Sequence, residues 1–94
     1  MKHSPIFEKA LTYFGEEAQL DILIEEMSEL TQAICKRKRG FDVDAMIIEE
    51  LVDVEIMLTQ IKLLFPSSAI NCVRVKKMKR LAATLKKAET KNDK

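Results

Sequence analysis

The sequence predicts an all-α fold, a four-helix chain whose two central helices form a long antiparallel hairpin. Among the 94 residues only two are glycine and two are proline, so long stretches can stay helical without a break. Apolar residues recur at spacings of three and four, the period of an amphipathic helix. The composition, 47% hydrophobic and 33% charged, and the chain length predict one globular domain over residues 1–94.

The first predicted helix begins at Ser4-Pro5, with serine as its cap and proline in the first turn, and ends at Gly15. A second helix runs from Glu16 toward Gly40, because no glycine or proline interrupts this stretch. Its first turn is acidic and its last turn is basic, which suits the helix dipole. Its apolar stripe consists of Leu20, Leu23, Met27, Leu30 and Ile34.

A third helix is expected after the turn at residues 40–44, and it ends at Pro66 because the residue before a proline is pushed out of the helical region. The short turn makes the second and third helices antiparallel neighbours. Ser67 or Ser68 can cap a fourth helix, whose charged tail, residues 89–94, is expected to fray. The apolar stripe of the third helix consists of Ile47, Leu51, Val54, Leu58, Ile61 and Phe65.

Charge is distributed unevenly along the chain. Residues 1–65 hold 13 acidic and 7 basic residues, a net charge of −6, whereas residues 66–94 hold 2 acidic and 9 basic residues, a net charge of +7. The acidic part argues against a nucleic-acid partner, because it would repel the phosphate backbone. The basic part has two interpretations, a solvated helix face or a set of cations that holds phosphates.

The sequence predicts a cytoplasmic location. No apolar run approaches the roughly 20 residues that span a bilayer, so no membrane partner is expected. The first residues also lack the apolar stretch of a secretory signal. Cys35 and Cys72 do not have the spacing of a zinc pair and are expected to be buried, reduced thiols.

Each central helix carries two carboxylates three residues apart, Glu26 with Glu29 and Glu50 with Asp53. Residues at this spacing lie about 60° apart around a helix, so both members of a pair share one flank. The hairpin can therefore bring four carboxylates together, and their repulsion calls for a cation. Mg²⁺ is the expected metal, because it takes carboxylate oxygens and bridges to phosphates, and Mn²⁺ should substitute for it. The alternative is that these acids only cover a solvated helix face.

These residues resemble the signature of the MazG-like all-α nucleoside triphosphate pyrophosphohydrolases, Glu-Glu-x-x-Glu followed further along the chain by Glu-x-x-Asp. Here it reads Glu25-Glu26-Met27-Ser28-Glu29 and, after twenty intervening residues, Glu50-Leu51-Val52-Asp53. The resemblance covers about residues 14–85. The flanking positions that also match are Gly15, Gln19, residues 36–40 and residues 76–81.

The resemblance implies a Mg²⁺-dependent enzyme that hydrolyses an NTP or dNTP between the α and β phosphates, releasing a nucleoside monophosphate and pyrophosphate. It implies that the four paired carboxylates hold the metal. Glu25 or Glu49 can accept the proton of the attacking water, and both can equally be solvent-exposed without such a role. The basic residues that would clamp the triphosphate are Lys76, Lys79 and Arg80, with Lys36 and Lys38 as further candidates.

The resemblance also implies a MazG-like bundle completed in a homodimer or homotetramer, because such relatives complete their core and sites across subunits. Four isoleucines fall off the main apolar stripes, which indicates helices covered on more than one side. Two other functions stay open: a catalytically silent module that binds metal and nucleotide, and a helical interaction protein whose acids are merely solvated. The four isoleucines are Ile22, Ile24, Ile48 and Ile56.

Overall fold

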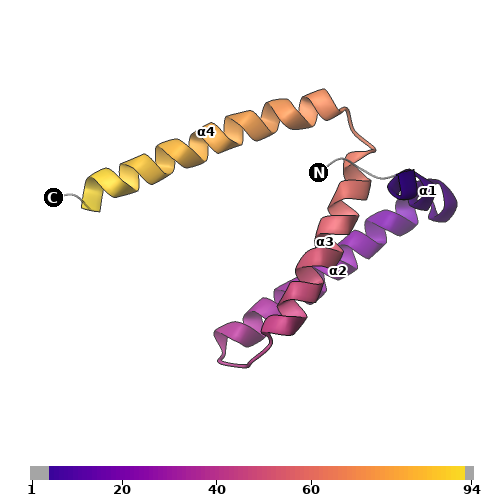
Figure 1. Cartoon of the computed structure of the whole chain (residues 1–94), viewed down its shortest axis with the longest axis horizontal. Coiled ribbons are helices and arrows are strands. Elements are labelled where there is room, and N and C mark those ends of the chain that lie inside the picture. Colours follow the sequence, from indigo (N-terminus) through magenta and orange to yellow (C-terminus); the bar gives the residue numbers. More distant parts are fainter. Residues whose placement is uncertain (1–4, 93–94) are drawn as a thin grey trace. The chain divides into compact units, whose positions relative to one another are not determined.

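The computed structural model describes residues 5–92, and helices make up nearly all of this part. No strand occurs among the described residues, which confirms the predicted all-α class and the four helices. The chain divides into two compact units between Leu64 and Phe65, one holding the first three helices and one holding the fourth. The single domain over residues 1–94 stays a prediction. In chain order the helices are α1 (Pro5–Phe14), α2 (Glu16–Lys38), α3 (Asp44–Lys62) and α4 (Ser67–Asn92) (Figure 1).

One glycine ends α1 and opens α2. Gly15 has φ +94° and ψ 150°, a conformation that glycine adopts without steric cost. Its N–H donates to the carbonyl of Leu11 at 2.9 Å, and its own carbonyl accepts from the N–H of Gln19 at 3.1 Å. Pro5 is the first residue of α1, as predicted, and the predicted cap Ser4 lies outside the described residues.

The turn between α2 and α3 is short and is closed by a charged pair. α2 ends at Lys38, and Gly40 follows in the left-handed region with φ +93°. Arg37 Nε donates to Asp44 Oδ1 at 2.8 Å, which links the last turn of α2 to the first residue of α3. The two helices therefore run antiparallel and lie side by side (Figure 1), as the sequence predicts.

The prediction that the third helix ends at Pro66 is wrong. α3 ends at Lys62. The N–H groups of Leu63 and Leu64 then donate to carbonyls three residues back, both at 3.0 Å, which is a tighter turn than that of an α-helix. The proline constrains the residue before it, but the chain has already left the α-helix when it reaches that point.

The start of α4 also differs from the prediction. The carbonyl of Pro66 accepts the N–H of Ala69 at 3.1 Å, so Pro66 begins the hydrogen-bond pattern of the helix. Residues 67–68 are therefore the first residues within α4, and neither serine is its cap. α4 continues through residues 89–92 of the tail that was expected to fray, and residues 93–94 lie outside the described part.

The row of residues between α2 and α3 is called the seam here, and it contains few apolar side chains. Of the two predicted stripes, Leu23 and Val54 are buried in the seam, whereas Met27 and Leu51 are 41% and 51% exposed. Each stripe thus lies only partly against the partner helix. The prediction that the two cysteines are buried is wrong, because Cys35 and Cys72 both lie on exposed positions of their helices. The buried apolar residues of the described chain are Leu23, Ala33, Val54 and Met57.

Two buried amides occupy one end of the seam. Gln19 and Gln60 are 3% and 5% exposed, and Gln19 Nε2 donates to Gln60 Oε1 at 2.6 Å. Gln60 Nε2 in turn approaches Met57 Sδ at 3.5 Å. Gln19 Oε1 is shielded from solvent and has no hydrogen-bond partner among the described residues. This polar pair occupies a position of the seam that would otherwise hold an apolar layer.

Candidate metal centre

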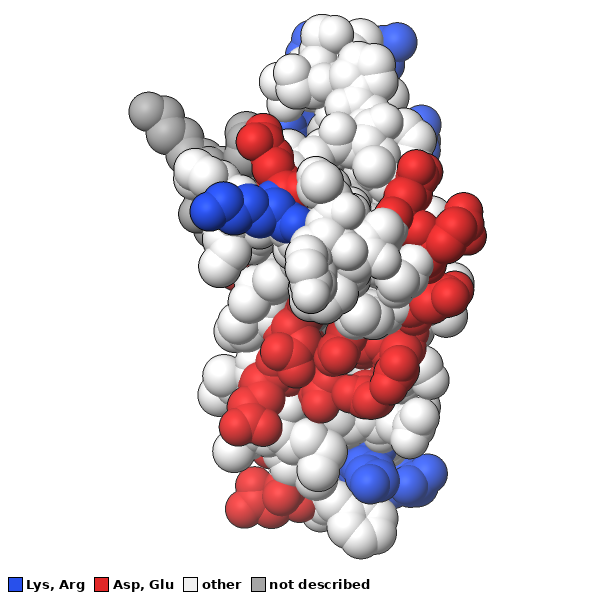
Figure 2. All heavy atoms as spheres, turned by 90° about the vertical axis from the view of Figure 1, so that its right-hand side faces the viewer, with Lys and Arg blue, Asp and Glu red and all other residues white. Residues whose placement is uncertain are grey.

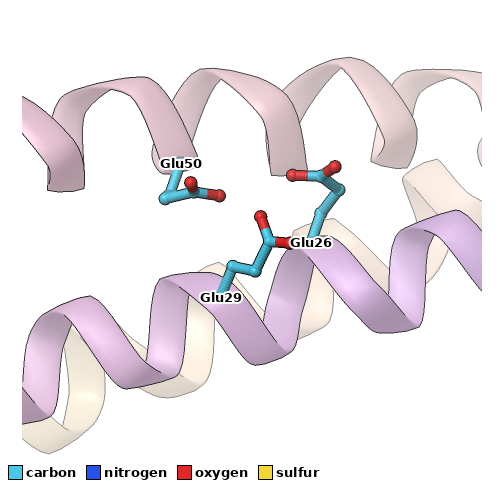
Figure 3. A group of neighbouring side chains, drawn as sticks. All are labelled: Glu26, Glu29 and Glu50. Carbon is cyan, nitrogen blue, oxygen red and sulfur yellow. The ribbon is translucent and has the colours of Figure 1, made fainter.

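Three glutamates meet between the central helices. Glu26 and Glu29 extend from α2, and Glu50 extends from α3 toward them (Figure 3). One carboxylate oxygen from each lies within 4.8 Å of those of the other two. These three residues are called the carboxylate cluster below.

The seam places glutamates where an apolar side chain would be expected. Along α2, Glu26 follows the buried Leu23 by three residues, and along α3, Glu50 precedes the buried Val54 by four. These spacings put both carboxyl groups on the same side of their helices as the buried apolar residues. All three members of the carboxylate cluster are accordingly half-buried.

Asp53, the fourth predicted ligand, is placed differently. Its side chain is exposed, and it does not belong to the carboxylate cluster. It nevertheless lies close enough for its negative charge to raise the pKa of both Glu26 and Glu50. The structure therefore brings three of the four predicted carboxylates together and leaves the fourth on an exposed flank nearby.

Burial and mutual repulsion disfavour the ionised forms of the carboxylate cluster. Burial, followed by the negative charge of Glu29, raises the pKa of both Glu26 and Glu50 above the ordinary value of 4.5. A hydrogen bond with Glu50 offsets part of this rise in the pKa of Glu26. One oxygen of each, Oε2, is shielded from solvent and has no hydrogen-bond partner among the described residues. Both oxygens are therefore available to accept a hydrogen bond or to coordinate a cation.

The donor set fits a hard divalent cation. Within residues 5–92 no lysine or arginine forms an ion pair with the carboxylate cluster, and the Arg37–Asp44 pair lies at the turn. Carboxylate oxygens are the ligands of Mg²⁺ and Mn²⁺, and Mg²⁺ keeps several waters when only a few protein oxygens are present. Three carboxylates from two facing helices supply such a partial set.

The two proposed proton acceptors, Glu25 and Glu49, both have exposed side chains. Each directly precedes a member of the carboxylate cluster in the sequence. Glu25 acts on its neighbour electrostatically, since its charge contributes to the raised pKa of Glu26. Exposure keeps both carboxylates accessible to water, and neither belongs to the carboxylate cluster itself.

Among the predicted basic residues, Lys36 and Lys38 both lie in the exposed last turn of α2. Lys36 follows Glu29 by seven residues, two helical turns, and so lies on the same side of α2 as that glutamate. Lys38 projects from a different side at about 100° per residue. The helix geometry therefore favours Lys36 over Lys38 as a neighbour of a molecule bound at the carboxylate cluster.

The other predicted basic residues lie on α4, in the second compact unit. Lys76, Lys79 and Arg80 are all exposed, and their spacing of three and four residues puts them on one flank of the helix. They form one local group of positive charge on α4.

Acidic side chains gather on one face of the hairpin. Figure 2 shows Asp and Glu side chains gathered in a band across this face, and the carboxylate cluster lies between α2 and α3.

In the part of the chain that the structure describes, no helix has the length and apolar character needed to cross a membrane.

Sequence reasoning did not predict the buried pair of Gln19 and Gln60. Glutamine inside a helix is usually a surface residue, and neither position interrupts the helical pattern. The sequence does place both glutamines on the buried side of their helices, since Gln19 precedes the buried Leu23 by four residues and Gln60 follows the buried Met57 by three.

No protein-family model, curated protein or solved structure matches this chain. The likeness to the MazG-like enzymes therefore rests on the residues of the two acidic motifs and their flanks.

Proposed function

We propose that this protein is a Mg²⁺-dependent nucleoside triphosphate pyrophosphohydrolase that converts an NTP or dNTP to the monophosphate and pyrophosphate. The observation that supports the proposal most directly is the carboxylate cluster, three carboxylates within 4.8 Å of one another on facing helices. Two of them have a shielded oxygen without a partner among the described residues, which is the arrangement a divalent cation would stabilise. The acidic motifs that resemble MazG-like enzymes supply the reaction class.

In this proposal Glu26, Glu29 and Glu50 hold Mg²⁺, and Asp53 adds negative charge at the exposed edge. The metal would supply neutralisation of the phosphate charge and a lowered pKa of water. Glu25 or Glu49 then accepts the proton of the attacking water, since both are exposed beside the carboxylate cluster. Attack at the α phosphorus breaks its bond to the bridging oxygen and releases pyrophosphate.

The basic residues bind the triphosphate in this proposal. Lys36 shares the side of α2 that carries Glu29 and is the cation of this unit that would bind phosphate oxygens. For the group on α4, in the other compact unit, phosphate binding is what the resemblance implies. A chain with an acidic metal site and separate cations can bind a metal–nucleotide complex without attracting a nucleic-acid duplex. The cations of the α4 group are Lys76, Lys79 and Arg80.

The reaction is tested by incubating the full chain with each common NTP and dNTP in MgCl₂, and by following the products with ³¹P NMR. We expect pyrophosphate and monophosphate from at least one nucleotide, and no turnover in EDTA. With ¹⁸O-labelled water the label should enter the monophosphate. Orthophosphate and diphosphate as first products would refute the proposed reaction, and binding of every nucleotide without turnover would identify a silent binding module.

Two sets of variants separate the roles of acids and cations. Glu50→Gln should abolish turnover, because it removes one of the proposed metal ligands. Lys76→Ala and Arg80→Ala should raise KM or lower kcat while the Mg²⁺-dependent thermal shift stays as in the parent, because the metal needs only oxygens. Glu89→Gln, on the same helix as those cations, is the matched control. If both cation variants turn over nucleotide as the parent does, the phosphate clamp assigned to α4 is wrong.

A further inference from the structure

An exposed aromatic ring lies at the turn that joins α2 to α3. Phe41 is 59% exposed, and the guanidinium of Arg39 lies over its ring, 5.8 Å from the ring centre. The N–H of Phe41 donates to the carbonyl of Lys36 at 3.1 Å, and the Arg37–Asp44 pair closes the same turn. The turn therefore holds the ring beside the last turn of α2, with one ring face open to a second planar group.

The same turn carries positive charge on the acidic face of the hairpin. Residues 36–39 are four consecutive basic residues, within a part of the chain, residues 1–65, that has a net charge of −6. Figure 2 shows Lys and Arg side chains at this end of the hairpin, on the face that carries the acidic band. Arg37 and Arg39 already have partners, whereas Lys36 forms no ion pair within residues 5–92. Lys36 can therefore bind phosphates that extend from the carboxylate cluster toward the turn.

Phe41 lies about as far from the carboxylate cluster as the base of a bound nucleotide would. Lys36 follows Glu29 by seven residues, a rise of about 10 Å along α2, and Phe41 is hydrogen-bonded to Lys36. In a nucleotide about seven to nine bonds separate a metal-bound phosphate oxygen from the base, an extended reach of about 10 Å. The other exposed rings of this unit, Tyr13 and Phe14, lie about 18 Å or more along α2 from the nearest glutamate of the cluster.

The surroundings of Phe41 suit stacking better than base selection. Every base has a π-face, so stacking on an aromatic side chain is open to all of them. Hydrogen bonds reject a wrong base strongly only where a buried polar group is left without a partner. Residues 36–42 are all exposed, so water can replace a base at any polar group of the turn. The turn can therefore bind a nucleoside, but it discriminates weakly among bases.

We infer that the base of a nucleotide held at the carboxylate cluster stacks on Phe41, and that purines and pyrimidines bind there with similar affinity. The inference rests on the proposed function, to which it adds a subsite for the base. The phosphates run from the cluster past Lys36, and the ribose lies between that lysine and the ring. The substrate is then a nucleoside triphosphate rather than an inorganic polyphosphate, because only the nucleotide has a group that fills this subsite.

Isothermal titration calorimetry of the full chain in MgCl₂ compares α,β-methylene ATP, which resists cleavage at the proposed bond, with inorganic tripolyphosphate. The nucleotide analogue should bind the parent chain roughly 5- to 100-fold more tightly, the range that one stacked base contributes. Phe41→Ala should remove most of this advantage and leave the affinity for tripolyphosphate unchanged. Phe14→Ala is the matched control, because Phe14 is 60% exposed but adjoins the opposite end of α2. Analogues with the other common bases should bind the parent chain within about tenfold of one another.

The outcomes separate the subsite from the reaction. Equal binding of the ATP analogue by the parent chain and Phe41→Ala, or an equal loss of tripolyphosphate binding, overturns the inference. Binding that depends on Phe41 in a chain that releases no pyrophosphate from ATP supports the subsite and refutes the reaction. Turnover with an affinity that is independent of Phe41 does the reverse. A parent chain that binds neither ligand overturns both.

A fluorescence measurement covers the case in which Phe41→Ala alters the turn. The chain contains no tryptophan, so Phe41→Trp introduces a single fluorophore at the position of the ring. The ATP analogue should quench this fluorescence by stacking, and tripolyphosphate should not. Phe14→Trp should respond to neither ligand. Equal quenching of Phe41→Trp by the two ligands, or quenching by neither, contradicts stacking of the base on this residue.

Discussion

Glu26→Gln removes one negative charge from the carboxylate cluster and keeps the shape of the side chain. In the parent chain without metal, Glu26 Oε2 is shielded and has no hydrogen-bond partner among the described residues, and a Glu29 oxygen lies within 4.8 Å of the Glu26 carboxylate. Two unit charges at this separation repel by about 1 kcal/mol in a water-like medium, which suits groups that remain in contact with solvent. The glutamine also provides an N–H donor, whereas ionised carboxylates offer only acceptors.

We therefore expect Glu26→Gln to raise the unfolding midpoint in EDTA by about 5 °C, because 1 kcal/mol shifts the midpoint of a domain of this size by about 4–8 °C. Mg²⁺, in contrast, should stabilise the parent chain more than the Glu26→Gln variant. A site with a dissociation constant of about 1 mM gains about 1.4 kcal/mol at 10 mM Mg²⁺, and the variant lacks one ligand of that site. The stability advantage of the variant in EDTA should therefore disappear in MgCl₂.

Thermal unfolding followed by circular dichroism measures both effects, at pH 7.5 and at equal ionic strength in EDTA and in MgCl₂. The matched control is Glu55→Gln, which removes one charge from an exposed position of α3 outside the carboxylate cluster. The control should leave the Mg²⁺-dependent shift unchanged. A lower midpoint for Glu26→Gln in EDTA, or a full Mg²⁺ shift in that variant, would refute the reasoning about the carboxylate cluster.

Three further predictions concern the packing that supports the site, and urea unfolding measures each of them. Gln19→Ala should lower the free energy of unfolding by about 1–3 kcal/mol, because it leaves the buried Gln60 Oε1 without its donor. The double variant Gln19→Leu with Gln60→Leu should be close to neutral, because it removes both polar groups. Equal losses of stability in the two variants would contradict this account of the pair. Gly15→Ala should cost about 1–3 kcal/mol through backbone strain alone, since nothing lies within 4 Å of the added Cβ. Ala33→Leu should cost about 1–3 kcal/mol, because Ala33 is 1% exposed between the helices. An unchanged stability in either of the last two variants would show that the chain adjusts locally at that position.

Most of the fold could be predicted from the residues that interrupt helices. Gly15 and Gly40 both adopt positive φ. Each lies at a break between two helices, where the sequence predicts one. Pro66 indicates only how far α3 could extend, because a proline disfavours the helical conformation of the residue before it but does not prevent the helix from ending earlier. The helix ended instead in the tight turn of Leu63 and Leu64.

The candidate site was predicted in part, for a geometrical reason. A spacing of three places two carboxylates on one flank, but it does not specify how far that flank turns toward the partner helix. In the structure Glu26 and Glu50 both take part in the seam, whereas Asp53 lies further around α3 and is exposed. The apolar stripes carried the same ambiguity, since they include both buried residues of the seam, such as Leu23, and exposed residues, such as Met27. Only the packing of α2 on α3 separates these sets.

The pH dependence of stability gives a last prediction, and its sign follows from the raised pKa of Glu26 and Glu50. A carboxyl group whose pKa is higher in the folded state binds its proton more tightly there than in the unfolded chain. Without metal, the stability from these two groups is fully present below the ordinary pKa of 4.5 and is lost as the pH rises through the raised values.

Other acids titrate in the same range, so the useful quantity is the difference in midpoint between Glu26→Gln and the parent chain in EDTA. Glutamine resembles the protonated glutamate, and the difference should therefore be small below pH 4.5 and grow as the pH rises. The stabilisation of the parent by Mg²⁺ should grow over the same interval, because the metal binds the ionised carboxylates. Midpoints measured between pH 4 and 8 test both trends. A difference that does not change with pH would mean that the charge of Glu26 is not what destabilises the metal-free cluster.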